Sequence, residues 1–203
     1  MEHILNQIIL RGSLHSLPEF SHENHGRKFF HFFLEVPRLS GAVDILSVIT
    51  EESILSAVDL SGGEMLTVRG QVRSHNLYVE GKRHLMIFVF AASILAEEGE
   101  PINDVILEGS LCREPTYRRT PMGREICDVM LAVPRTFRRA DYLPCILWGR
   151  MAQEASRCHT RDQIRIYGRL QSRTYTKVTE NGPEERVAYE VSALTAEIPD
   201  DLF

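Results

Sequence analysis

Alternating apolar and polar residues in the second half of the chain predict a small β barrel. Five segments follow this two-residue period, and each ends in Gly, Pro or charged turn residues: 105–111, 126–133, 143–148, 163–170 and 187–194. Between the third and fourth segments the spacing becomes helical, at Met151, Ala155 and Cys158. Three strands, one helix and two strands is the order of an OB barrel, a fold that presents a sheet face and loops to oligonucleotides.

The first half of the sequence repeats the second half at a shift of 97 residues. Identical pairs at this shift, or at 98 for the last one, include Asn6/Asn103, Gly12/Gly109, Arg38/Arg135, Asp44/Asp141 and Ser74/Ser172. A duplicated barrel retains such positions because turn glycines and core residues are dictated by backbone and packing. We therefore expect an all-β fold of two tandem five-stranded OB barrels, each with one short helix, at 1–96 and 103–198.

Charge is divided unequally between the two repeats, although the whole chain carries −5. Residues 1–100 hold 8 Lys and Arg against 13 Asp and Glu, whereas residues 101–194 hold 15 against 12. An acidic chain is no general nucleic-acid binder, but a basic face can still form locally. The sequence places that face in the second repeat.

Aromatic side chains and arginines are interleaved where the sheet face and loops of the second barrel are expected. They are Tyr117, Arg118, Arg119, Phe137, Arg138, Arg139, Tyr142, Trp148, Arg173 and Tyr175. Aromatic rings stack on bases and guanidinium groups pair with phosphates, which suits an unpaired strand. Duplex readers place a helix or ribbon in the major groove instead, and the expected helix lacks a turn-helix partner. Aromatic stacking surfaces bind the bases of DNA and RNA alike, so these residues do not distinguish a DNA ligand from an RNA ligand.

The same stretch resembles the bacterial single-stranded DNA-binding proteins of replication and repair. The resemblance covers roughly residues 103–198 and rests on segments that stand in the family's order: ILEGSL, Thr120-Pro-Met-Gly123, LAVPR, ILWGRMAQEAS and YGRLQSRTY. It implies sequence-independent binding of single-stranded DNA in replication, recombination or repair. Base stacking is then expected at four positions: Phe137, Tyr142, Trp148 and Tyr175. Three of these positions usually hold Trp in the family, whereas here only Trp148 does.

Phosphate contacts are expected from the arginines of the second repeat: Arg118, Arg119, Arg135, Arg138, Arg139, Arg150 and Arg173, with Tyr117 beside them. The first repeat lacks the stacking set, because it has Ser40, Ile45, Glu51 and Leu77 at the corresponding positions. We therefore expect a structural or oligomerisation role for the first barrel and DNA binding by the second. Its aromatic run at residues 29–33 is interpreted as a strand with one buried face.

No motif in the sequence indicates catalysis, a metal site or another cofactor. Cys112, Cys127, Cys145 and Cys158 form no C-x-x-C pair, so we expect four buried thiols. His22 and His25 lie in one loop without a set of converging ligands, which favours a solvated loop over a metal site. No signal peptide is visible and the longest apolar run is too short for a membrane span, so we expect a cytoplasmic protein.

Two further expectations follow from the resemblance. Family members with one barrel per chain assemble as tetramers, so two barrels per chain imply a homodimer with the same number of barrels. The end of the chain, Asp200, Asp201, Leu202 and Phe203, resembles the family's acidic tip, which recruits partner proteins of replication and repair. The alternative for this tip is an ordinary frayed terminus.

An alternative function is an OB-fold interaction module that bridges replication or restart proteins and binds nucleic acid only weakly. The acidic first repeat favours this alternative. The Arg and aromatic content of the second repeat opposes it, because solvated charge alone does not require Phe137, Tyr142 and Trp148 on one sheet.

Overall fold

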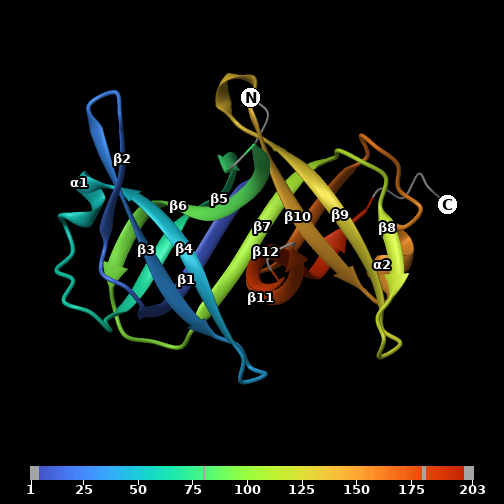
Figure 1. Ribbon diagram of the computed structural model, residues 1–203, viewed down its shortest axis with the longest axis horizontal. Helices are drawn as coiled ribbons and strands as arrows, with labels where there is room; N and C mark the ends of the chain where they lie inside the picture. The colour runs from blue at the N-terminus through green and yellow to red at the C-terminus, as the bar shows by residue number, and fades with distance from the viewer. Residues whose placement is uncertain (1–4, 80, 180–181, 199–203) are drawn as a thin grey trace.

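The computed structural model describes residues 5–79, 81–179 and 182–198, and strands make up most of them. Two barrels lie side by side, with a short helix near each far end (Figure 1). The all-β fold of two tandem OB barrels is therefore confirmed. Within the described ranges, no helix is long and apolar enough to cross a bilayer.

The first barrel is closed by five strands. They are β1 (Asn6–Leu14), β3 (Arg27–Pro37), β4 (Val43–Glu51), β5 (Met65–Val79) and β6 (Lys82–Ala96). β1 pairs with both β3 and β5, and β4 pairs in parallel with β6, which closes the ring. The helix α1 (Glu52–Leu55) follows β4, and the strand β2 (Glu19–Asn24) extends outward as a hairpin with β3.

The second barrel repeats this arrangement. Its strands are β7 (Ile102–Leu111), β9 (Glu125–Pro134), β10 (Ala140–Trp148), β11 (Gln163–Thr179) and β12 (Gly182–Glu197). β8 (Thr116–Arg119) forms a hairpin with β9, as β2 does with β3. The helix α2 (Arg150–Ala155) ends sooner than the sequence predicts, so Cys158 lies beyond it, still buried in the core.

Buried and exposed residues alternate along the strands, and the buried ones are mostly aliphatic side chains that fill the interior of each barrel. In β1, for example, Ile8, Leu10 and Leu14 point inward, and Val105, Leu107 and Leu111 do so in β7.

Two glycines in each barrel allow strands to cross closely. A Cβ at Gly12 or Gly70 would collide with a carbonyl oxygen of the neighbouring strand, and the counterparts Gly109 and Gly168 are similarly tight. This close approach explains why the repeats share these glycines.

The aromatic run of the first repeat lies in β3, where Phe29 and Phe32 are buried and Phe30 and Phe33 are partly exposed. Phe32 belongs to the barrel core. Phe29 instead packs near Phe90 and stacks on His22, with ring centroids 6.0 and 4.8 Å away. The strand prediction for this run is confirmed.

One prediction about the thiols is wrong. Cys127, Cys145 and Cys158 are buried, but Cys112 is exposed. Cys112 follows the last residue of β7, where the chain leaves the barrel for the β7–β8 turn. Burial raises the pKa of Cys127 and of Cys158 to about 11.

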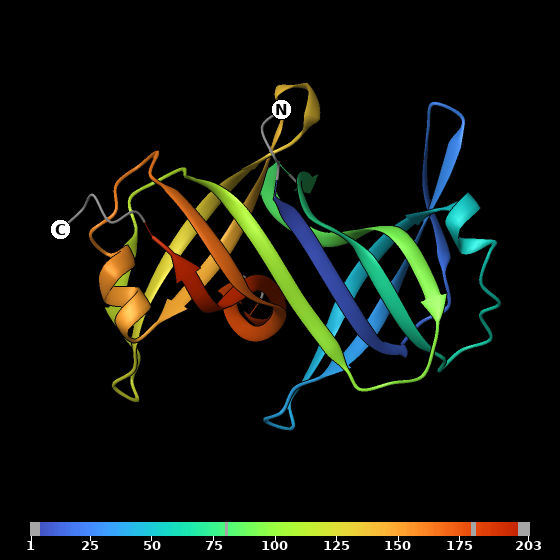
Figure 2. The same cartoon turned by 180° about the vertical axis from the view of Figure 1, so that it is seen from behind.

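An antiparallel pairing of β1 with β7 joins the barrels, so the twelve strands among the described residues form one continuous sheet. The two strands run side by side through the centre of the molecule, clearest from behind (Figure 2). Ile8 pairs with Val105, its own counterpart at a shift of 97 residues. The barrels are therefore related by a pseudo-twofold axis through this residue pair.

Two buried carboxylates reinforce the pseudo-symmetric contact, and we call the two sets of contacts the clasps. In the first clasp, Asp44 accepts a hydrogen bond from the backbone N–H of Ser172 in the other barrel (2.7 Å) and pairs with Arg38. Arg38 in turn donates to the Ser172 carbonyl (2.8 Å). The first barrel thus holds the long β11–β12 hairpin of the second.

The second clasp repeats the first with the barrels exchanged. Asp141 accepts from the Ser74 N–H (2.6 Å) and pairs with Arg135, which donates to the Ser74 carbonyl (3.0 Å). Arg73 lies 3.2 Å from the same carboxylate, and burial together with the charge of Arg135 lowers the pKa of Arg73. Asp44 and Asp141 are both fully buried. A buried charge that loses its partners is strongly destabilising, so the clasps fix how the barrels sit.

We predict that replacing a clasp carboxylate destabilises the whole chain. Asp141→Ala leaves Arg135 and the Ser74 N–H without their buried partner and should lower the free energy of unfolding by about 3–5 kcal/mol. Glu154→Ala, which removes the surface ion pair with Arg150, should cost below ~1 kcal/mol. Urea unfolding followed by circular dichroism measures both. Equal losses for the two variants would contradict the role of the clasp.

Candidate nucleic-acid interface

The predicted stacking residues of the second barrel come mainly from β10 and β11. Tyr142 and Trp148 lie on one face of β10, six residues and so roughly 20 Å apart. β12 lies between these strands, pairing in parallel with β10 and antiparallel with β11, which carries Arg173 and Tyr175. Alternation along the three strands turns these side chains outward, away from the barrel core.

Trp148 is half-buried at the end of β10. Its indole N–H donates to the Ser192 hydroxyl on β12 (3.0 Å), which fixes the plane of the ring. A hydrogen-bonded indole N–H on a ring that stays partly exposed is typical of tryptophans at binding surfaces. The geometry therefore offers a pre-positioned ring at this end of the sheet.

Tyr175 and Tyr142 are more open, 38% and 45% exposed. The Arg173 guanidinium carbon lies 5.7 Å from the centroid of the Tyr175 ring, within cation–π range. Tyr142 is anchored through its backbone, whose N–H donates to the Ser74 hydroxyl of the first barrel (2.8 Å). The second clasp thus extends directly to a predicted stacking residue.

A hollow of about 740 Å³ adjoins Tyr175, and we call it the Tyr175 hollow. Both barrels line it: Pro144, Lys177 and Arg186 come from the second and Lys82 and Arg83 from the first. Neither of the two first-barrel cations was predicted from the sequence. They stand at the start of β6, and their repeat is acidic as a whole.

Phe137 lies on the loop between β9 and β10 and is 93% exposed. Its φ of 60° and the 54° of Arg138 lie in the left-handed region, which non-glycine residues adopt rarely and at a cost. A hydrogen bond from the Arg135 N–H to the Arg139 carbonyl (2.7 Å) closes the loop. The loop therefore holds an apolar ring in water at the expense of backbone strain, which is typical of a binding residue.

The arginines of this loop differ in what they contact. Arg138 and Arg139 are exposed, and neither forms an ion pair with any residue in the described ranges. Arg135 is committed to Asp141 and the Ser74 carbonyl of the second clasp. The first two guanidinium groups are thus available to a phosphate, whereas the third joins the barrels.

The β8 hairpin carries Tyr117, Arg118 and Arg119, all exposed. Arg118 pairs with Asp128 (2.6 Å) and Arg119 with Glu125 (3.1 Å). A hydrogen bond to Glu125 raises the pKa of Tyr117. These three predicted residues gather on one hairpin at the edge of the sheet, with their charges partly neutralised.

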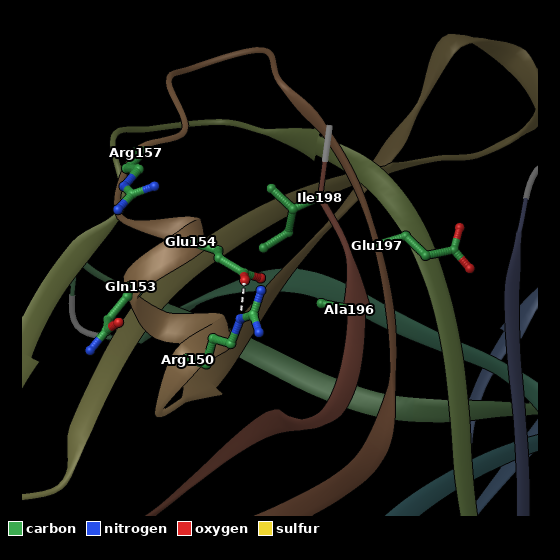
Figure 3. A pocket seen from close by; sticks show the side chains of 7 residues that line it. All are labelled: Arg150, Gln153, Glu154, Arg157, Ala196, Glu197 and Ile198. Carbon is green, nitrogen blue, oxygen red and sulfur yellow. Dashed lines mark hydrogen bonds and ion pairs between the residues drawn. The ribbon is translucent and has the colours of Figure 1, made fainter. Parts of the chain in front are cut away.

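Arg150 is not brought together with Tyr142 and Tyr175. It lines a separate hollow of about 710 Å³ between α2 and the end of β12, and it pairs with Glu154 at 2.7 Å (Figure 3). The other lining residues are Gln153, Glu154, Arg157, Ala196, Glu197 and Ile198. Among these described residues no aromatic ring is present, so this hollow offers no stacking surface.

The first barrel holds the expected non-aromatic residues at the equivalent sites. Ser40 lies in the β3–β4 turn, Ile45 and Glu51 in β4, and Leu77 in β5. Glu51 faces Arg27 at 3.6 Å. No group of three His, Cys, Asp or Glu side chains in the described ranges is placed to hold a metal ion. The predicted partner-binding tip, Asp200 to Phe203, lies outside the described residues.

Comparison with known proteins agrees with this geometry. The model of the single-strand binding protein family matches residues 102–198. Single-stranded DNA-binding protein B of Bacillus subtilis is 36% identical over 80 residues, which are 36% of this chain and 71% of that protein. The chain belongs to the single-strand binding protein family.

The likeness to solved structures in this family extends over both barrels. The wild-type single-stranded DNA binding protein from Thermus aquaticus superposes with a TM-score of 0.78 at 26% identity, covering 96% of this chain and 93% of that one. Single-stranded DNA-binding protein 1 of Staphylococcus aureus is 37% identical over 81 residues, 36% of this chain and 48% of that protein. The chain spans about half the length of the first curated relatives it matches.

Proposed function

We propose that this protein binds single-stranded DNA without sequence preference and without catalysis. The bases of the bound strand would stack on Tyr142, Trp148, Tyr175 and Phe137, while arginine guanidinium groups neutralise its phosphates. The observation that carries the proposal is Phe137, a nearly fully exposed ring held on a strained loop next to Arg138 and Arg139. A core or scaffold role would not require this arrangement.

The relatives of this chain support the proposal. The matched proteins of Bacillus subtilis, Staphylococcus aureus and Thermus aquaticus are all described as single-stranded DNA-binding proteins. Membership of their family makes replication, recombination or repair in the cytoplasm the expected setting for this chain.

Within the chain, the second barrel would supply the principal binding face and the first barrel mainly the scaffold. The four stacking residues, with Arg138 and Arg139, all belong to residues 103–198. Residues 1–96 would support that face through the clasps and through Lys82 and Arg83 at the Tyr175 hollow. The acidic tip at Asp200 to Phe203 would recruit replication or repair proteins.

We further propose a homodimer, which would bring together four barrels. Two strands with an open edge, β2 and β8, lie at the ends of the described sheet. Two exposed apolar side chains, Tyr78 and Val79, lie at the end of β5. Both features favour association with a second copy of the same surface.

Removal of a stacking ring tests the proposed function. Trp148→Ala or Tyr175→Ala should weaken binding to an unstructured oligonucleotide about tenfold or more, because a stacked base contributes ~1–3 kcal/mol. Glu51→Ala, at the first-barrel position equivalent to Trp148, should leave affinity unchanged. Anisotropy of a labelled oligonucleotide measures affinity, and circular dichroism checks folding. Folded Trp148 and Tyr175 variants with wild-type affinity would contradict the proposal.

Arg138 and Arg139 should contribute a separable electrostatic effect. Replacing both by Ala should flatten the plot of log affinity against log salt by up to ~0.7 for each phosphate that the variant no longer binds. Tyr175→Ala should lower the same line with little change of slope, because stacking releases no counterions. Salt titrations of the wild type and the two variants measure the slopes. An unchanged slope in the double variant would show that these arginines bind no phosphate.

The proposed dimer predicts the mass in solution. Light scattering across micromolar concentrations should give twice the 23.2 kDa of one chain. A monomeric mass over the whole range would overturn the proposal.

A further inference from the structure

A third hollow, of about 730 Å³, lies where the first barrel meets the Phe137 loop of the second barrel; we call it the Phe88 hollow. Its lining residues are Ser21, His22, Ile49, Arg73, His75, Leu77, Phe88, Phe90, Arg135, Thr136, Phe137 and Arg139. The size falls within the range of ordinary ligand sites. Nothing in the proposed function of the second barrel accounts for this hollow.

Aromatic rings on the first barrel form one wall of the hollow. Phe88 and Phe90 are two residues apart on β6, so both rings turn to the same side of the sheet, and both are half-buried. The His75 ring lies 5.8 Å from Phe88, and buried Phe29 packs 6.0 Å from Phe90. Each ring therefore has an aromatic neighbour and keeps part of its surface exposed, as a base-stacking surface requires.

Guanidinium groups lie around these rings. Arg73 comes from β5, and Arg135 and Arg139 come from the loop of the second barrel. None of the described residues that line the hollow is acidic, and the nearby Asp141 is fully buried. Three arginines against that single carboxylate leave a net positive charge, which suits the phosphates of a nucleic-acid strand better than an acidic or neutral cavity would.

The hollow is continuous with the proposed binding face. Phe137 belongs both to the stacking set of the second barrel and to the lining of the Phe88 hollow. A strand that stacks a base on Phe137 therefore arrives at the hollow with its next nucleotides. Arg139, which follows on the same loop, also lines the hollow.

The barrels carry their rings on different strands. Phe88 pairs with Arg73 in the first barrel as Glu190 pairs with Gln171 in the second, so Phe88 and Glu190 are structural equivalents. Phe90 and Ser192 are equivalent in the same way. The second barrel has Tyr142 and Trp148 on β10, whereas the equivalent strand of the first barrel, β4, has no aromatic ring. The first barrel instead has two rings on β6.

We propose that the Phe88 hollow is a second stacking subsite, which takes nucleobases of the same single strand against Phe88 and Phe90 and a phosphate against Arg139. This inference rests on the proposed single-stranded DNA binding. It extends the binding path from the second barrel onto the first.

Oligonucleotide length provides the test. A strand of about 10 nucleotides, within the ~4–16 that one OB fold occupies, should be held by the second barrel alone. A strand about three times as long should also reach the hollow. Phe88→Ala should therefore weaken binding of the long strand about fivefold or more and leave the short strand unaffected. Phe20→Ala is the matched control, because Phe20 is an exposed ring on the same barrel that does not line the hollow.

Two further variants test the subsite independently of Phe88→Ala. Phe88→Leu preserves apolar volume without the ring and should show the same length-dependent loss if Phe88→Ala fails to fold. A reporter variant that combines Phe88→Trp with Trp148→Phe places the single indole of the chain in the hollow, and its fluorescence should change when the long strand binds. Anisotropy of the labelled strand reports binding independently of this indole.

The outcomes separate the two proposals. If the wild-type protein binds neither strand, the proposed function is wrong. If it binds both while folded Phe88→Leu matches the wild type at both lengths, the subsite is wrong and the function stands. Saturated binding of the long strand without any change in the indole fluorescence of the reporter variant would also reject the subsite.

Discussion

Two buried carboxylates, Asp44 and Asp141, determine how the parts of this molecule sit together. Each binds an arginine of its own barrel and a backbone N–H of the other, so neither can be solvated without breaking contacts on both sides. Because burial of an unpaired charge costs so much, the barrels behave as one unit. The hollows at their junction have fixed walls as a result. Tyr142 and the Phe137 loop are positioned by the same contacts, through Ser74 and Arg135.

Much of this fold could be predicted from the sequence because barrel strands alternate strictly and the repeat doubles the signal. Gly12 and Gly109 mark the same close strand approach in both copies. The strands β2 and β8 were not predicted, since every residue in them is exposed and no alternation marks them. Nothing in the sequence distinguishes Cys112 from the three buried cysteines. It is exposed because the chain leaves the barrel directly after β7.

The proposed site could be predicted in part. Phe137, Tyr142, Trp148 and Tyr175 were proposed as stacking residues because each occupies a position that the family resemblance identifies. Ser74 and Ser172 were visible as identical residues, but sequence cannot tell that each reaches across to the opposite barrel. That contact depends on how far two long hairpins extend, which is a property of the assembled sheet. The absence of aromatic rings from β4 was visible when the two repeats were compared at a shift of 97 residues. The rings on β6 were not recognised, because the shift between equivalent residues grows to 102 on that strand.

The pairing of Ile8 with Val105 across a pseudo-twofold axis has an evolutionary consequence. When two identical chains associate about a true axis, every substitution appears on both sides, so a change that helps one side and harms the other cannot be kept. Here both sides belong to one gene product, and each can change alone. The molecule keeps the geometry of a symmetric pair while its two halves diverge, with Phe88 in one place where Glu190 stands in the other.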